Sequence, residues 1–173
     1  MFTWNSIGII DEQSLIAITG EAWLRQPTTV RKCCAVGPSG GTGGDCCIDD
    51  PIPEGAQIKM IRVHHSDRID AIGISYEVNG ETVDLMHGGT GGTEDKFVLN
   101  PDEYVMGVYW CFGNIIDSIT IVTNQRESPL YGGPGGNAHY CYVLGSDMEI
   151  VGFLGRAKKA IDAIGCVFRA RPA

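Results

Sequence analysis

Short apolar segments alternate with turn residues along most of the chain. Many of these segments are rich in β-branched or aromatic residues, and several alternate apolar with polar positions, as strands do. Turn sequences such as NGE, NPDE and LGSD separate them. Strands are therefore expected at 58–63, 71–78, 96–99, 104–110, 118–123, 138–144, 149–154 and 164–168. Only GRAKKAIDAIG, residues 155–165, has the composition of a helical turn.

Two sequence markers recur three times in register. The first is a glycine loop, GGTGG at 40–44, GGTGG at 88–92 and GGPGG at 132–136. The second is IDAI or IDSI, at 69–72, 116–119 and 161–164. From the first Gly of each loop to the Asp of each following marker is 30, 29 and 30 residues (40 to 70, 88 to 117, 132 to 162). This internal threefold repeat predicts an all-β domain of about twelve strands, four in each unit.

The order of the motifs resembles that of the jacalin-related lectins. GPSGGTGG is followed by HGGTGG, EYVMGVYW, SITIVTN, YGGPGG, GFLGR and IDAIG, and the resemblance covers about residues 36–170. It implies a mannose-type member of that family with the β-prism I fold, in which three four-stranded antiparallel Greek-key sheets surround a pseudo-threefold axis. It also implies a lectin domain over 35–173, with sugar sites at one end, after an extension of uncertain structure over 1–34.

The repeated glycines have a chemical explanation in such a protein. Glycine tolerates φ > 0 and carries no Cβ, so a glycine loop presents bare backbone N–H groups to a closely approaching ligand. A facing aspartate accepts hydrogen bonds from sugar hydroxyls, which are both donors and acceptors. The spacing suggests that Asp70 and Asp117 each face the loop that follows, and that Asp162 faces the first loop. We call each such pairing of a loop with an aspartate a cup.

The first cup follows the family's principal site, which combines the N-terminal glycine loop with a last loop of pattern GxxxD. By resemblance it comprises Gly44, Lys158, Lys159, Ala160 and Asp162. Position 158 is Lys where the family has Gly. A lysine there predicts backbone strain if φ must be positive, and it places a long cationic side chain beside the cup.

The other two cups depart from the family pattern to different degrees. The second resembles the extra site of bivalent mannose-binding members, with Ser66 at the Gly position; its residues are Gly91, Gly92, Asp67, Arg68 and Asp70. The third keeps the full GxxxD spacing, and its residues are Gly135, Gly136, Gly113, Asn114 and Asp117. Family precedent thus favours the cup of Asp162, and intact spacing favours that of Asp117. The candidates for an aromatic face are Phe112, Tyr131 and Trp110, although strand aromatics more often belong to the core.

Two interpretations of the cups stay open. In the first, the protein binds mannose- or glucose-type glycans or glycoproteins, because galactose-specific members are cleaved after the first glycine loop and GGTGGDCCID here is continuous. In the second, glycines and aspartates only support tight turns, and the prism is a protein-interaction or scaffold module. A single hexose buries little surface, so useful avidity is expected to require several cups or a homo-oligomer.

The cysteines allow three arrangements. Seven occur, at 33, 34, 46, 47, 111, 141 and 166, and the CC pairs flank the first glycine loop. Cross-strand disulfides in a hairpin, a four-thiolate zinc site, or free thiols are compatible with this spacing. Free thiols are the simplest expectation, because the sequence shows no signal peptide.

Composition and charge narrow the partners. The 173 residues, 43% of them hydrophobic, are enough for one packed core. The formal net charge of −8 disfavours nucleic acid and anionic lipid, and no window is apolar enough to span a membrane. The histidines, His64, His65, His87 and His139, are dispersed, and no GxSxG, HExxH or GxxxxGK[ST] occurs. We expect no enzyme, cofactor or metal, and a protein that is cytoplasmic or exported without a signal peptide.

Overall fold

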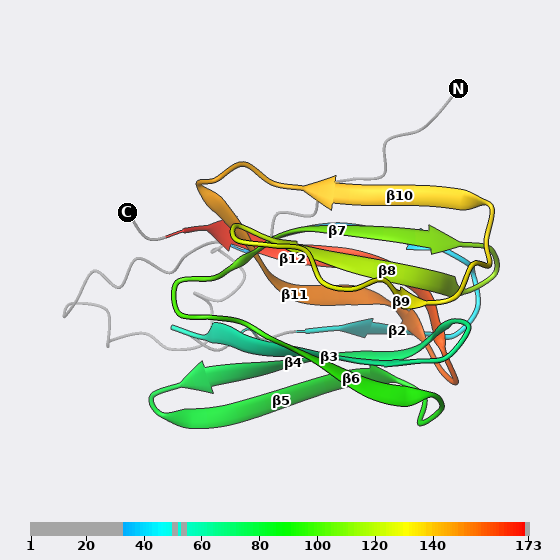
Figure 1. Ribbon diagram of the computed structural model, residues 1–173, viewed down its shortest axis with the longest axis horizontal. Helices are drawn as coiled ribbons and strands as arrows, with labels where there is room; N and C mark the ends of the chain where they lie inside the picture. The colour runs from blue at the N-terminus through cyan, green and yellow to red at the C-terminus, as the bar shows by residue number, and fades with distance from the viewer. Residues whose placement is uncertain (1–32, 50–51, 53–54, 172–173) are drawn as a thin grey trace, which may run out of the picture.

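The chain forms a prism of three β-sheets whose strands all run along its length (Figure 1). The computed structural model describes residues 33–49, 52 and 55–171, and all regular elements within these ranges are strands. They are β1 (Cys34–Gly40), β2 (Asp45–Ile48), β3 (Gln57–His65), β4 (Ile69–Val78), β5 (Glu81–Gly88), β6 (Thr93–Val98), β7 (Val105–Phe112), β8 (Ile116–Thr123), β9 (Tyr131–Gly132), β10 (Ala138–Val143), β11 (Met148–Ala157) and β12 (Ile161–Ala170). Twelve strands in the described chain confirm the expected number.

The three sheets share one topology. Their strand orders are β1-β12-β11-β2, β5-β4-β3-β6 and β10-β7-β8-β9, and all the pairs are antiparallel. In each sheet a central hairpin is flanked by two outer strands, and a glycine loop joins the outer strands. In the first sheet the N-terminal strands β1 and β2 flank the C-terminal hairpin β11–β12, so the two ends of the domain complete one unit. The expected β-prism with threefold repetition is confirmed.

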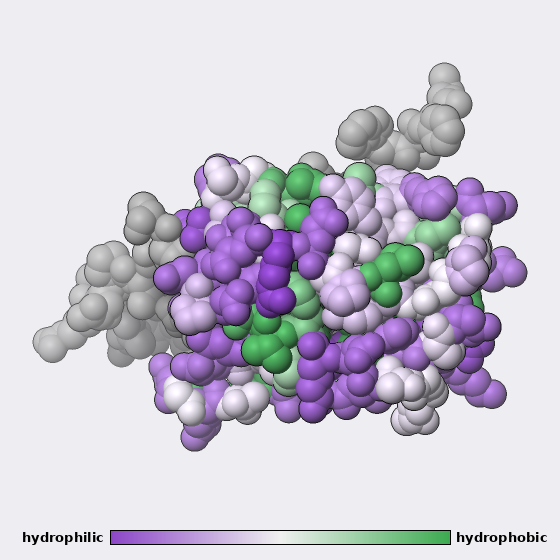
Figure 2. Space-filling view, in the orientation of Figure 1, coloured by the Kyte–Doolittle hydropathy of each residue, from purple (hydrophilic) through white to green (hydrophobic). Residues whose placement is uncertain are grey.

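The core lies inside the prism, between the inward faces of the three central hairpins. Side chains of alternate residues meet there, as the period of a strand dictates. Ile61 and Val63 of β3, Ile121 of β8 and Phe153 of β11 are among the fully buried members. The outer surface is different: Figure 2 shows a mostly hydrophilic face, on which apolar side chains form small patches separated by polar ones.

Two local expectations are wrong. Residues 155–165 are not a helical turn, because they form the end of β11, a bend at 158–160 and the start of β12. The strands around the first glycine loop are not a hairpin either. β1 and β2 lie at opposite edges of their sheet, so Cys34 and Cys46 are not cross-strand neighbours.

The cysteines of the described chain provide neither a disulfide framework nor a metal site. Cys34, Cys46, Cys47, Cys111, Cys141 and Cys166 are thiols. Within the described ranges, no group of three or more His, Cys, Asp or Glu side chains could hold a metal ion. Burial raises the pKa of the Cys166 thiol, and burial followed by the nearby Asp49 charge raises that of Cys47. Both thiols therefore stay protonated and unreactive at neutral pH.

At one end of the prism the three units interlock through backbone contacts at glycines. A Cβ added at Gly41 would lie 1.8 Å from the carbonyl oxygen of Asn114, in the aspartate turn of another unit. At Gly89 it would lie 2.2 Å from Lys159 O, and at Gly133 2.6 Å from Asp67 O. Each glycine loop thus touches the aspartate turn of a different unit, and the three contacts form a closed ring. Only glycine permits so close an approach.

The other end of the strands holds an ion pair with a buried carboxylate and a partly exposed arginine. The Glu103 side chain is 0% exposed, and Arg126 Nε lies 2.9 Å from its Oε1. Glu103 also accepts hydrogen bonds from Asn100 N at 2.7 Å and Thr123 Oγ1 at 2.7 Å. Burial alone would raise the pKa of Glu103, but these hydrogen bonds and the Arg126 charge together lower it below its ordinary value.

We expect this carboxylate to make the free energy of unfolding decrease as the pH falls into the acid range. Because the folded state lowers the pKa of Glu103, its stabilising effect is present at neutral pH and is lost as pH falls below the ordinary carboxyl range. Glu103→Gln replaces one acceptor with an NH₂ group facing a donor, and should cost about 2 kcal/mol at pH 7. Urea unfolding at pH 7 and pH 3 checks this, because the gap between wild type and variant should narrow at pH 3. A gap that is equal at both pH values would contradict it.

Candidate functional site

Each of the three marker aspartates, Asp70, Asp117 and Asp162, lies against one glycine loop. A Cβ added at Gly43 would lie 2.3 Å from Asp162 Oδ1, and one at Gly135 would lie 2.3 Å from Asp117 Oδ1. The corresponding distance from Gly91 to Asp70 Oδ1 is 2.9 Å. The pairing is therefore the one expected from the order of the markers. Since the nearest atoms to each added Cβ belong to the aspartate, each carboxylate lies directly against the loop backbone.

The backbone of the three cups is alike. Gly41 N, Gly89 N and Gly133 N donate to the carbonyl oxygens of Asp162, Asp70 and Asp117, at 2.7, 2.8 and 3.0 Å. Within the aspartate turns, Lys158 N, Ser66 N and Gly113 N each donate to the carbonyl two residues on, at 3.0–3.1 Å. What distinguishes the cups is therefore their side chains.

Lys158 does not introduce the backbone strain that a positive φ at this position would cause. The non-glycine residues with positive φ in the described chain are Asn79 and Asp102, so Lys158 has an ordinary backbone conformation. Gly113, at the equivalent position of the third cup, also lacks a positive φ. The turn does not need glycine for its conformation, so a lysine fits at residue 158 without a backbone penalty.

The first cup has the most available carboxylate. Asp162 is partly buried, and among the described residues none donates a hydrogen bond to its side chain. Lys158 and Lys159 are exposed, and within the same ranges neither ammonium group forms an ion pair, whereas Ala160 is buried. The glycine loop is fixed from the other side by Arg156, which donates to Gly43 O and Gly44 O. Within the described ranges, neither lysine therefore pairs with the Asp162 carboxylate.

The second cup is closed by its own side chains. Asp70 is 1% exposed, and its Oδ1 accepts a hydrogen bond from Arg68 Nε at 3.0 Å. Ser66 Oγ contacts Asp70 Oδ2 at 3.5 Å and Asp67 Oδ1 at 3.2 Å. A ligand hydroxyl would have to displace the Arg68 guanidinium to reach this carboxylate. The same residues that the sequence assigned to the cup thus occupy it.

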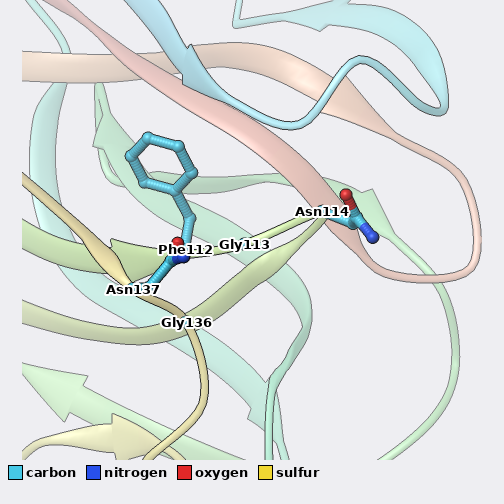
Figure 3. Close-up of a pocket in the computed structure, with 5 residues that line it drawn as sticks. All are labelled: Phe112, Gly113, Asn114, Gly136 and Asn137. Atoms are coloured by element: carbon cyan, nitrogen blue, oxygen red, sulfur yellow. The ribbon is translucent and has the colours of Figure 1, made fainter.

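The third cup opens onto a surface pocket. Asp117 is partly buried, and its Oδ2 accepts a hydrogen bond from Gly113 N at 2.9 Å. The pocket is lined by Phe112, Gly113, Asn114, Gly136 and Asn137, and Figure 3 shows the Phe112 and Asn114 side chains at opposite ends of the Gly113 turn.

Sequence reasoning identified part of this lining. Of the aromatic candidates, Phe112 is among the lining residues but packs against the core, and Trp110 and Tyr131 are 3% and 4% exposed and belong to the core. Asn137 and Arg156 were not predicted. Asn137 directly follows the third glycine loop, and Arg156 ends the GFLGR motif. Their place beside or within a recurring family motif was therefore the signal that the sequence offered for them.

Two histidines connect structural elements near the cups. Gly132 N donates to His65 Nδ1 at 3.1 Å, and His65 Nε2 lies 2.9 Å from Asp95 Oδ2. His87 Nε2 lies 2.6 Å from Asp49 Oδ1, which joins β5 to the residue after β2. Both imidazoles are engaged in contacts between segments, which is a structural role.

Among the described residues, no helix is long and apolar enough to cross a bilayer.

Comparison with known proteins agrees with this geometry. Residues 36–167 match the Jacalin-like lectin domain family. Horcolin of Hordeum vulgare is 34% identical over 139 residues, and the match covers 75% of this chain and 92% of horcolin. Jacalin-related lectin 9 of Arabidopsis thaliana is also 34% identical, over 141 residues; the match covers 75% of this chain but only 44% of that protein, so this chain corresponds to less than half of it.

A solved structure gives the same result. AcmJRL, described as a mannose-binding jacalin-related lectin from Ananas comosus, superposes with a TM-score of 0.71 at 26% identity, over 79% of this chain and 97% of that one. The family match spans most of the chain and includes all three glycine loops and all three aspartate turns. This chain belongs to the jacalin-like lectin domain family and is a carbohydrate-binding lectin by fold and by sequence.

Proposed function

We propose that the protein is a non-enzymatic lectin for mannose- or glucose-type glycans and that the first cup is its principal site. The observation that carries this proposal is the Asp162 carboxylate, which stands beside Gly43 and Gly44 and accepts no hydrogen bond from the described chain. A partly buried carboxylate with free lone pairs next to exposed backbone amides fits a pair of vicinal hydroxyls.

The third cup is the second site of the proposal. Its Asp117 carboxylate keeps one oxygen available, because the hydrogen bond from Gly113 uses the other. Asn114 and Asn137 also line its pocket, and their amide side chains can exchange hydrogen bonds with sugar hydroxyls. The second cup contributes least, because Arg68 and Ser66 already satisfy Asp70.

Comparison supports a mannose preference. AcmJRL is described as mannose binding, and its superposition covers 79% of this chain. Each cup buries little of a hexose, so a single site should bind with a Kd of about 1 mM. Avidity for a branched glycan then requires two cups on one chain or several chains in a homo-oligomer, which we propose as the mode of action.

Isothermal titration calorimetry of the purified full chain tests this function. Methyl α-mannopyranoside should bind with a Kd of about 1 mM, and methyl α-galactopyranoside at least about tenfold more weakly. A glycan array probes avidity in parallel. Absence of binding to any glycan at high density would contradict the proposal and favour the scaffold interpretation, whereas a galactoside preference would overturn only the sugar class.

A further inference from the structure

Three different side chains occupy one equivalent position behind the cups. Arg156, Cys111 and His64 each precede the cup aspartate by six residues (156 to 162, 111 to 117, 64 to 70). Each is paired across the strands with a residue just after a glycine loop: Arg156 with Cys46, Cys111 with His139, and His64 with Glu94. The position therefore lies where the central hairpin meets the end of the glycine loop.

At this position in the first unit, the Arg156 side chain donates two hydrogen bonds to the glycine loop. Its Nε donates to Gly43 O at 2.7 Å, and its Nη2 donates to Gly44 O at 2.7 Å. The third nitrogen, Nη1, lies 3.5 Å from Cys46 Sγ. The planar guanidinium thus holds two successive carbonyls in fixed directions, which a flexible ammonium group cannot do.

Fixing a carbonyl also fixes the following amide. A peptide unit is planar and trans, so the N–H of Gly44 points opposite to the C=O of Gly43. With Gly43 O directed toward Arg156, the Gly44 N–H is directed away from it. Gly44 has φ +65°, a conformation that side-chain-bearing residues rarely adopt, and a Cβ there would lie 2.6 Å from Asp162 Oδ2. The loop therefore needs glycine as well as an anchor to keep its amide in place.

The third unit has the same kind of contact in weaker form, and the second unit lacks it. Cys111 Sγ donates to Gly135 O at 3.3 Å, which is the carbonyl equivalent to that of Gly43. In the second unit, His64 Nε2 lies 3.7 Å from Glu94 Oε2, and no described contact joins it to Gly91 O. The strength of the anchor thus decreases from guanidinium to thiol to none, and the least anchored cup is also the one that Arg68 closes.

We propose that Arg156 is a positioning residue for glycan binding, which acts by orienting the Gly44 amide of the first cup, and that Cys111 does the same for Gly136 of the third. Neither side chain needs to touch the sugar. The inference rests on the proposed function of the first cup, and it predicts that the affinity of that cup depends on a residue behind its loop.

The test is a titration of ¹⁵N-labelled protein with methyl α-mannopyranoside, followed by NMR at the Gly44 and Gly136 amides. Arg156→Met keeps the aliphatic stem and removes the donors. We expect it to shift the Gly44 resonance, to leave Gly136 unchanged, and to raise the Kd of the first cup about fivefold, the effect of one misdirected hydrogen bond. Arg156→Lys can donate to one of the two carbonyls and should give an intermediate Kd. If Arg156→Met does not fold, Arg156→Lys is compared with wild type instead.

Controls separate the inference from the function on which it rests. In an Asp162→Asn background, Arg156→Met should change binding no further. If Asp162→Asn weakens binding but Arg156→Met and Arg156→Lys match wild type, the inference is overturned and the lectin function stands. If wild type binds no mannoside, both fail. An equal loss at Gly136 and Gly44 would show a general loosening of the fold and would also overturn the positioning role.

The third cup provides an independent arm. Cys111→Ser keeps a hydrogen-bond donor for Gly135 O, whereas Cys111→Ala removes it. We expect the alanine variant to shift the Gly136 resonance and to weaken the third cup about threefold, while serine preserves both and Gly44 stays unchanged in either variant. Equal effects of serine and alanine would overturn the role of Cys111.

Discussion

Asp162→Asn is expected to weaken binding of methyl α-mannopyranoside at the first cup by about tenfold or more. Asparagine has nearly the same shape, but it replaces one acceptor oxygen with an NH₂ donor and removes the charge. Hydrogen bonds from neutral hydroxyls to a carboxylate are worth about 1.5–3 kcal/mol each, roughly twice those to a neutral acceptor. Because the described chain donates nothing to this carboxylate, its acceptor capacity is available to the ligand. Titration calorimetry of the variant beside wild type measures the loss.

Asp70→Asn is the matched control for this experiment. It makes the same chemical change in the second cup, where Arg68 Nε already occupies Asp70 Oδ1 and the side chain is 1% exposed. We expect glycan affinity within about twofold of wild type, together with lower stability because a buried charged partner of Arg68 is lost. Equal losses of affinity in both variants, or a loss only in Asp70→Asn, would contradict the ranking of the cups.

Gly41→Ala is expected to lower the free energy of unfolding by about 3 kcal/mol, a large effect for the addition of one methyl group. The added Cβ would lie 1.8 Å from the carbonyl oxygen of Asn114. The position of a Cβ is fixed by its own backbone and the neighbouring oxygen is a backbone atom, so no side-chain rotation relieves the overlap and the loop must separate from the neighbouring turn. Unfolding in guanidinium chloride, monitored by tryptophan fluorescence, gives the free energy.

Gly113→Ala is the control for that substitution. It is also a glycine without positive φ in the same ring of loops, but a Cβ there would have its nearest neighbour, Asp117 Oδ2, at 3.8 Å, an ordinary contact. We expect a change in stability within about 0.5 kcal/mol. If Gly41→Ala were as stable as Gly113→Ala, the close packing between the loop and the Asn114 turn would not exist in solution.

The fold could be predicted from the sequence because its threefold symmetry appears there as two recurring markers. The recurrence of glycine loops and of Asp70, Asp117 and Asp162 at nearly constant spacing sets the number of units, and alternation sets the strands of the central hairpins. The pairing of each aspartate with its loop also followed from order alone, since a turn and a loop of one unit must meet at the same end of a sheet.

Four of the outer strands, β1, β2, β5 and β9, and the side chains inside the cups were not predicted, whereas the outer strands β6 and β10 were expected at 96–99 and 138–144. β5, with the sequence ETVDLMHG, is mostly exposed, so it lacks the apolar pattern of a core strand and is held by its pairing with β4. Residues 155–165 are rich in good helix formers, yet pairing with β1 and β2 makes their ends strands. That Arg68 turns toward Asp70 and Arg156 toward Gly43 depends on rotamers, which no spacing encodes.

The closed ring of loop contacts has a consequence for recognition of large ligands. Because Gly41, Gly89 and Gly133 each abut a turn of a different unit, no loop can shift without displacing its neighbours. The separations between the binding positions are therefore built into the scaffold rather than adjusted during association. If the first and third cups bind sugar as proposed, a branched oligosaccharide must supply two arms whose reach matches their fixed separation, so antenna geometry, more than the identity of the terminal sugar, would decide which branched partners gain from simultaneous attachment.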